Sequence, residues 1–157
     1  MKYCGSLYVV DDATKTKDFY KELFGLRVIQ DFGANFTLTG GISFQTRESW
    51  KEFIHKKDED IVYKGNDAEL YFETDDLDGF IEKLKSYDIE YVHDLQVHEW
   101  GQRGIRFYDP DKHILEVGET LKQVCQRLLD QGMTIEEVSK KTMLSIKMIE
   151  RILQRGS

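Results

Sequence analysis

The sequence feature that most constrains the fold is an internal repeat. Residues 6–31, SLYVVDDATKTKDFYKELFGLRVIQD, and residues 69–94, ELYFETDDLDGFIEKLKSYDIEYVHD, follow one pattern at an offset of 63–64 positions. Each copy reads as a strand, an acidic pair, an amphipathic helix and a second strand. A solenoid needs at least three copies, so two copies predict a duplicated supersecondary unit.

The periodicity within each copy predicts a helix followed by three strands. Phe19, Leu23 and Phe24 recur at helical spacing in the first copy, and Gly25 can take the left-handed conformation that ends a helix. Asp76 is the expected N-cap of the second helix, whose apolar stripe is Leu77, Phe80, Ile81, Leu84 and Tyr87. The later strands are expected at 26–30, 35–39 and 42–46, and again at 90–97, 105–108 and 113–117. Both copies therefore read β-α-β-β-β, which predicts an α+β fold.

Composition excludes several classes of protein. The 157 residues are 40% apolar and 32% charged, as in ordinary soluble domains, and Cys4 and Cys125 are too few for a disulfide framework. The apolar run near the N-terminus is too short for a signal peptide, which favours a cytoplasmic protein. The sequence has no G-x-G-x-x-G or Walker A motif, no Ser-His-Asp order and no C-x-x-C pair. Nucleotide binding and acyl transfer therefore lack support.

The end of the second copy carries WGQRGIRFYDPDKHILEVGE, residues 100–119, and the first helix carries DFY, residues 18–20. With the repeat, these motifs resemble the glyoxalase / bleomycin resistance / extradiol dioxygenase superfamily, also called vicinal oxygen chelate proteins. The resemblance covers about residues 3–119. It implies that the two units, about 3–46 and 67–118, curl into a cup of eight mixed strands within a domain of residues 1–119.

The resemblance also implies a function. Metal-dependent members hold one divalent ion on the cup floor, where it polarises vicinal oxygens of the substrate. Members that confer antibiotic resistance use the cup without metal to sequester a drug, commonly as dimers. The chain is therefore expected to bind a small molecule in the cup, either as a lyase or isomerase or as a metal-free sequestering protein, and to form a homodimer.

The metal ligands implied by the resemblance are incomplete in this sequence. The family's last ligand matches Glu116, and the ligand that opens the second half matches Glu69. The ligand that opens the first half falls at Gly5, or at Cys4 with a shift of one residue, and the fourth falls near Ser43 or Gln45. Zinc normally takes three or four N, S or carboxylate ligands, whereas magnesium and manganese accept oxygen and water. The expectation stays open between no metal and a weakly held Mg²⁺, Mn²⁺, Zn²⁺ or Ni²⁺.

Glu116 is a lone acid within an apolar strand. Because strand side chains alternate, Ile114 and Glu116 point one way while Leu115 and Val117 point the other. A carboxylate that faces a mostly dry cup is costly unless it is paired. The partner is expected to be an arginine, either Arg103 or Arg106, or a bound cation. Two interpretations stay open, a structural Glu–Arg pair and a substrate-facing catalytic acid, the role also expected for Glu69.

Several other side chains are expected to line the cup. Glu69 and Tyr71 should face it, because Leu70 and Phe72 on the opposite face should pack beneath the second helix. Trp100 offers a flat apolar wall and an N–H donor, or it closes the barrel edge. Trp50, in a short helical turn of the linker at 50–54, either covers the cavity mouth or seals the core. The expected substrate-binding set is Gln45, Trp50, Tyr71, Trp100 and Arg103. The four histidines do not cluster and are expected at the surface.

The turn at residues 109–112 departs from the family at one position. Pro110 suits the second position of a type I turn. The family usually has glycine where Lys112 stands, at a place that often needs a positive φ. A residue with a Cβ there costs on the order of 1 kcal/mol.

The tail, residues 120–157, differs from the rest in charge. It holds seven basic and four acidic side chains, whereas residues 1–119 hold 15 basic and 25 acidic ones, and an acidic body does not attract nucleic acid. Three helices are expected, at 121–131, 135–141 and 146–154, with Thr134 and Glu137 as a capping box. The last two resemble a helix-turn-helix.

For DNA binding, the final helix should present polar or basic residues. Lys147, Arg151 and Arg155 share that helix with five apolar residues, most of which a short helix must bury. We therefore expect a packing or dimerisation extension, and we do not expect a nucleic-acid partner. A ligand-responsive regulator that uses these helices is the alternative.

Overall fold

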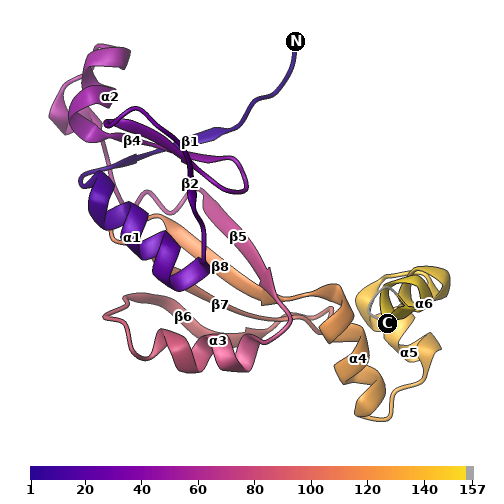
Figure 1. Ribbon diagram of the computed structural model, residues 1–157. Coiled ribbons are helices and arrows are strands. Elements are labelled where there is room, and N and C mark those ends of the chain that lie inside the picture. Colours follow the sequence, from indigo (N-terminus) through magenta and orange to yellow (C-terminus); the bar gives the residue numbers. More distant parts are fainter. Residues whose placement is uncertain (155–157) are drawn as a thin grey trace. The chain divides into compact units, whose positions relative to one another are not determined.

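The first repeat forms a four-stranded mixed sheet with a helix against one face (Figure 1). This computed structural model describes residues 1–154. The strand order is β1-β4-β3-β2, with β1 parallel to β4 and the other neighbours antiparallel. The elements are β1 (Ser6–Val10), α1 (Ala13–Phe24), β2 (Val28–Asp31), β3 (Asn35–Leu38) and β4 (Ile42–Thr46). The linker that follows forms α2 (Arg47–Ile54) and a short 3-10 turn (Asp58–Asp60), so its helix begins three residues earlier than expected.

Helix α1 begins and ends at residues whose chemistry explains the boundaries. The Asp12 carboxylate accepts hydrogen bonds from the backbone N–H groups of Thr14 and Lys15, which satisfies two donors that the helix itself leaves unpaired. Gly25 ends the helix at φ 69°, as the sequence predicts. The buried face of the helix brings the Tyr20 ring to 5.0 Å from that of Phe44 on β4, and both rings are fully buried.

The second repeat has the same arrangement, with the strand order β5-β8-β7-β6. Strand β5 is parallel to β8, and the other neighbours are antiparallel. Its elements are β5 (Glu69–Thr74), α3 (Leu77–Leu84), β6 (Tyr91–Val97), β7 (Arg103–Tyr108) and β8 (Ile114–Glu119). The eight strands thus stand in two four-stranded mixed sheets, one from each β-α-β-β-β unit, which confirms the predicted α+β fold.

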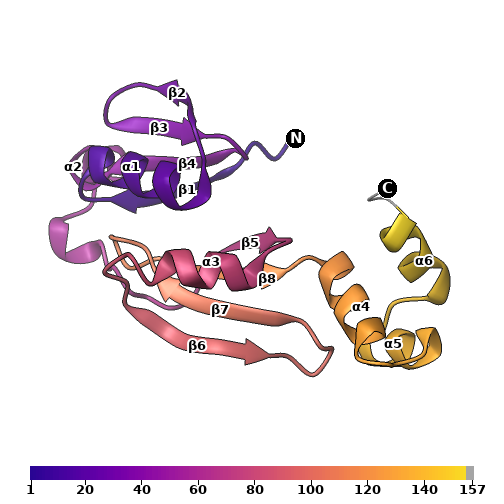
Figure 2. The same ribbon diagram turned by 60° about the horizontal axis from the view of Figure 1, so that its bottom comes forward.

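The two faces of the second sheet differ as the alternation of its strands predicts. Leu70, Leu115 and Val117 are buried, and they belong to the face that α3 covers (Figure 2). Phe80 of α3 packs over Phe107 of β7 with ring centroids 6.2 Å apart. Glu69, Tyr71 and Glu116 consequently project from the other face.

By its contacts the chain divides into two compact units, and the turn Asp109–His113 belongs to the first of them. The first unit otherwise spans Met1–Ala68, and the second spans Glu69–Tyr108 and the chain from Ile114 onward. The Asp111 carboxylate accepts a hydrogen bond from the Asp11 N–H at 2.8 Å. The buried Asp109 carboxylate accepts one from the Tyr20 hydroxyl at 2.9 Å. Lys112 has φ 70°, which confirms the left-handed conformation expected there.

The tail forms three helices, α4 (Leu121–Asp130), α5 (Ile135–Thr142) and α6 (Ile146–Gln154), and Arg155 lies outside the described residues. Thr134 and Glu137 form the predicted capping box. The helices pack around a buried cluster of Val124, Cys125, Leu128, Val138 and Ile149. Among the described residues, no helix has the length and apolar character that crossing a membrane requires.

Candidate functional site

The open face of the second sheet, away from α3, holds a cluster of charged side chains. Tyr71 pairs with Glu116 across β5 and β8, and Glu116 pairs with Arg106 across β8 and β7. Paired residues point to the same side of a sheet, so these three side chains meet on the open face. Glu69, two residues before Tyr71, lies on the same side.

Arg106 holds the two carboxylates together. Its Nε donates to Glu69 Oε2 at 2.9 Å, and its Nη2 donates to Glu116 Oε2. The Glu116 side chain is 7% exposed, whereas that of Glu69 is 37% exposed. The structure thus brings together the two acids that the sequence singled out, and it selects Arg106 as the partner of Glu116.

The environments of the two carboxyl groups shift their pKa values in opposite directions. The hydrogen bond from Arg106 lowers the pKa of Glu69. Burial raises the pKa of Glu116, and the charge of Arg106 offsets this only in part. Glu116 is therefore the group that takes up a proton first, while Glu69 stays ionised beside Arg106. A pair of titratable groups whose pKa values are pushed apart is typical of acid–base sites.

A second set of contacts surrounds Glu116 on the loop between β6 and β7. His98 Nε2 lies 3.5 Å from Glu116 Oε1. The His98 ring stacks on Trp100 with centroids 4.3 Å apart and an angle of 7° between the planes. Trp100 Nε1 donates to Gln102 Oε1 at 3.1 Å, so the indole is held at both its face and its N–H.

Gln102 extends this set of contacts to Tyr71. Its Nε2 donates to the Tyr71 hydroxyl at 2.8 Å and to the Glu119 backbone carbonyl at 2.7 Å. The Tyr71 hydroxyl in turn donates to Glu73 at 3.0 Å, and burial raises the pKa of Tyr71 to about 12. Tyr71 therefore offers a neutral hydroxyl beside the carboxylates.

Two glycines make room for these side chains on the open face. A Cβ on Gly104 would lie 3.2 Å from Glu116 Oε1, and one on Gly118 would lie 3.1 Å from Gln102 Nε2. Gly104 and Gly118 are cross-strand partners, so neither strand places a side chain there. Glu116 and Gln102 can then lie close against the backbone.

The residues present do not fit the divalent metal that the resemblance implies. Glu116 and Glu69 are both hydrogen-bonded to Arg106, a fixed positive charge that occupies the space between them and repels a cation. The matching position in the first repeat is Gly5, which has no side-chain donor, and Gln45 supplies only an amide. Among residues 1–154, no group of three or more His, Cys, Asp or Glu side chains is placed to hold a metal ion.

Arg103 does not join this cluster. It lies on the opposite face, where its Nε donates to Glu119 Oε1 at 2.7 Å and its two Nη atoms donate to Asp78 of α3. Arg127 of α4 also donates to Glu119, at 2.8 and 3.0 Å, and to the Gly101 carbonyl at 2.6 Å. Burial alone would raise the pKa of Glu119, but the hydrogen bonds from Arg127 and Arg103 lower it. This buried acid thus ties the tail to the loop that carries Trp100.

Gln45 and Trp50 belong to the first unit. Gln45 is buried on β4, where its amide donates to Ser49 Oγ at 2.8 Å and accepts a longer hydrogen bond of 3.4 Å from Asn35. Trp50 is half-buried on α2.

Sequence reasoning missed two of the residues around Glu116 and left a third undecided. Arg106 was one of two possible partners, and Gln102 was not considered. His98 was expected at the surface, but its side chain is only 19% exposed and lies against Glu116. The strand register could have identified Arg106 as the partner. Arg106 stands two residues after Gly104, so once β7 and β8 pair antiparallel both lie on the sheet face that carries Glu116.

Comparison with known proteins agrees with this architecture. Residues 3–122 match the family model of the glyoxalase-like domain, and a search of curated proteins gives no match. A protein of unknown function from Agrobacterium tumefaciens is 32% identical over 77% of this chain and 95% of its own, with a TM-score of 0.68.

More distant structures share the fold. A glyoxalase/bleomycin resistance protein/dioxygenase family enzyme from Burkholderia phytofirmans is 17% identical, covers 75% of this chain and 98% of its own, and has a TM-score of 0.65. Lactoylglutathione lyase from Agrobacterium tumefaciens is 19% identical, with 75% and 92% coverage and a TM-score of 0.57. With its family model matched over residues 3–122, the chain belongs to the glyoxalase-like domain family.

Proposed function

We propose that the open face of the second sheet binds a small, neutral, polar molecule and that Glu116 exchanges a proton with it. The observation that supports this is the Glu69–Arg106–Glu116 cluster, in which Arg106 lowers the pKa of one carboxyl while burial raises the pKa of its neighbour. A general acid or base works best when its pKa lies near the working pH. Burial moves Glu116 in that direction.

The charge of the cluster suggests the class of ligand. With Glu69 ionised and Arg106 cationic, the pair is neutral, and Glu116 adds either no charge or one negative charge. An anion would be repelled whenever Glu116 is ionised, whereas a carbonyl or hydroxyl compound can hydrogen-bond to Tyr71 and to Glu116. Trp100, 38% exposed, offers an apolar surface to the rest of such a molecule. Proton transfer next to a carbonyl is the chemistry of isomerases and lyases, and the proposal is an activity of that type.

The test is ligand discovery followed by isotope exchange. Neutral carbonyl and hydroxyl compounds are screened by the rise in melting temperature that binding causes, and each hit is incubated with the protein in D₂O. With the wild type, we expect NMR to show that a carbon-bound proton of the hit exchanges for deuterium. With Glu116→Gln, the hit should still bind but this exchange should be lost. Glu48→Gln, at an 84% exposed position on α2, is the matched control and should exchange at the wild-type rate.

Two results would overturn the proton-transfer proposal. The first is exchange at the same rate in Glu116→Gln as in the wild type. The second is tight binding without any exchange, which would identify the chain as a sequestering protein, the alternative that the resemblance implies. Hits that bind equally well to Arg106→Met would place the binding site elsewhere.

We also propose a homodimer, with residues 1–119 as the ligand-binding domain and residues 120–157 as an extension. Support for the dimer comes from the outer strands β2 and β6, which expose apolar side chains: Val28 and Ile29 on β2, and Val92, Leu95 and Val97 on β6. Exposed apolar edge strands tend to pair with another chain. Light scattering of the wild type should give a molar mass twice that of one chain, and Ile29→Lys should lower this mass. A monomeric wild type would refute the dimer.

A further inference from the structure

The tail is a separate three-helix cluster with its own small core. Helices α4, α5 and α6 all contact one another, around Val124, Leu128, Val138 and Ile149. The tail as a whole carries seven basic and four acidic side chains, against an excess of acids in residues 1–119. A positively charged module on an acidic protein is suited to a negatively charged partner.

Helices α5 and α6 are joined by a turn of three residues, Met143, Leu144 and Ser145. Met143 has φ 59°, the left-handed conformation that ends α5 and redirects the chain. The Ser145 hydroxyl accepts a hydrogen bond from the Met148 N–H at 3.3 Å and so caps α6. Two helices joined by a turn of this length resemble a helix-turn-helix, the motif of DNA-binding proteins in which the second helix enters the major groove.

Helix α6 buries or half-buries three of its five apolar residues: Ile149 is fully buried, and Ile152 and Leu153 are half-buried. Ile146 is 37% and Met148 45% exposed. Side chains advance about 100° per residue around a helix. Lys147 and Arg151, two positions before and after Ile149, therefore share the face directly opposite the core.

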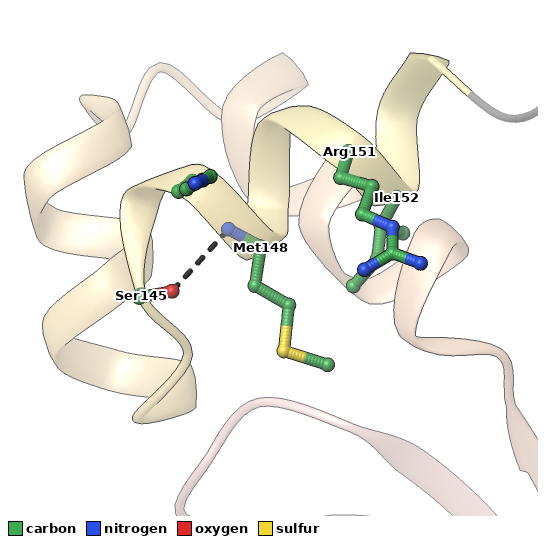
Figure 3. Close-up of a pocket in the computed structure, with 5 residues that line it drawn as sticks. Ser145, Met148, Arg151 and Ile152 are labelled. Carbon is green, nitrogen blue, oxygen red and sulfur yellow. Dashed lines mark hydrogen bonds between the residues drawn. The ribbon is translucent and has the colours of Figure 1, made fainter.

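One side of α6 borders a pocket of about 490 Å³, which is lined by Ser145, Lys147, Met148, Arg151 and Ile152. Figure 3 shows Ser145, Met148 and Arg151 along this side of the helix. The side chains comprise a hydroxyl, two cations, a flexible thioether and one aliphatic group. Hydroxyl and cationic groups are those that contact phosphates and base edges.

We propose that α6 is a recognition helix that binds the major groove of duplex DNA. Lys147 and Arg151 are the residues assigned to phosphates or to guanine edges. Ser145 at the helix start is assigned to a phosphate. Three acids accompany them, Glu136 and Glu137 at the start of α5 and Glu150 on the flank of α6. Glu137 is held in the capping box, and Glu150, three residues after Lys147 and so about 60° from it around the helix, borders the Lys147–Arg151 face.

A second copy of the chain is a poorer occupant of this face. A two-fold symmetric contact buries the same patch of both copies, so it would bring four cations, Lys147 and Arg151 of each copy, into one interface. Like charges brought face to face are unfavourable. DNA presents the opposite charge and a groove that accepts one helix.

The test begins with selection from a random duplex library by the full-length protein, followed by fluorescence anisotropy on the enriched duplex. We expect a consensus to emerge and the affinity to fall between about 0.05 and 0.2 M KCl, as counterion release requires. Lys147→Ala and Arg151→Ala should each weaken binding about tenfold, and a phosphate-contacting residue should also reduce the salt slope by about one. Lys15→Ala, which removes the same charge at an exposed position on α1, should bind like the wild type.

Because Lys147 and Arg151 are exposed, their replacement should leave the circular dichroism spectrum and melting temperature unchanged. Loss of binding can then be attributed to the contact. The proposal is overturned if no sequence is enriched and no duplex binds at about 0.05 M KCl. It is also overturned if both variants bind as the wild type does, or if Met148→Glu breaks a dimer in a protein that does not bind DNA.

Discussion

Replacement of Arg106 by methionine tests the physical basis of the candidate site. Methionine keeps an unbranched side chain of similar length but removes the cation, so Glu69 and Glu116 face each other without a shared partner. Glu116 is the more sensitive of the two because its side chain is only 7% exposed. The variant should therefore be destabilised while both carboxyls are ionised.

The magnitude follows from burial. A hydrogen bond to a charged group contributes about 1.5–3 kcal/mol, and loss of one partner from a fully buried ion pair costs about 3–5 kcal/mol. The Arg106 side chain is 24% exposed and that of Glu69 is 37% exposed, so solvent screens part of the interaction. We expect a loss of about 2 kcal/mol in the free energy of unfolding at about pH 8.

The loss should depend on pH in a defined direction. Burial already raises the pKa of Glu116 above that of the unfolded chain, and removal of Arg106 raises it further. The folded variant therefore binds a proton more tightly than the unfolded chain does. The loss in the free energy of unfolding of Arg106→Met, relative to the wild type, is therefore smallest below the unfolded pKa of about 4.3. It grows as pH rises through the folded pKa of Glu116.

Urea unfolding measured by tryptophan fluorescence gives the free energy. In a Trp50→Phe background the signal comes from Trp100 in the second unit, since the chain has two tryptophans. The deficit should be larger at about pH 8 than at about pH 5, and Arg106→Met with Glu116→Gln should recover most of it. Arg27→Met, at an exposed site on the first unit, is the control. Equal deficits at both pH values, or no recovery in the double variant, would refute the reasoning.

Three further predictions concern other parts of the chain. Met143→Gly should raise the free energy of unfolding by about 0.5–1 kcal/mol in chemical denaturation, because its φ of 59° suits glycine; Met143→Ala should not. Arg127→Ala should increase acrylamide quenching of Trp100, since Arg127 holds the Gly101 carbonyl of that loop, whereas Arg127→Lys should restore part of the protection. Although burial opposes it, the Asp109 carboxylate raises the pKa of His113. The stability from this pair is complete below about pH 6.5 and should decline in thermal melts as pH rises through the folded pKa, a dependence that His113→Gln should flatten.

The sequence predicted the architecture because its signals were local. Helix boundaries at Gly25, Asp76 and Thr134 follow from capping chemistry that one turn of chain determines. The alternation in Glu69–Thr74 correctly separated the buried Leu70 from the open-face carboxylate of Glu69.

The partners within the site were harder to predict because they depend on strand register. Arg103 and Arg106 are both basic and lie on the same strand, but an odd spacing puts them on opposite faces, and only the pairing of β7 with β8 decides which one meets Glu116. The role of Arg127 was beyond reach for a different reason. Its contacts with Glu119 and Gly101 join the tail to residues 8 and 26 positions earlier, and no periodicity records such a contact.

The assignment of the turn Asp109–His113 to the first unit has a consequence for synthesis on the ribosome. When residue 68 leaves the exit tunnel, the Tyr20 hydroxyl and the Asp11 amide have no carboxylate to receive them, because Asp109 and Asp111 have yet to be translated. We therefore expect the first unit to stay only partly folded until the turn Asp109–His113 has emerged. A nascent chain halted with residue 68 just outside the tunnel should be readily digested by protease, and one halted with residue 113 well outside it should be resistant.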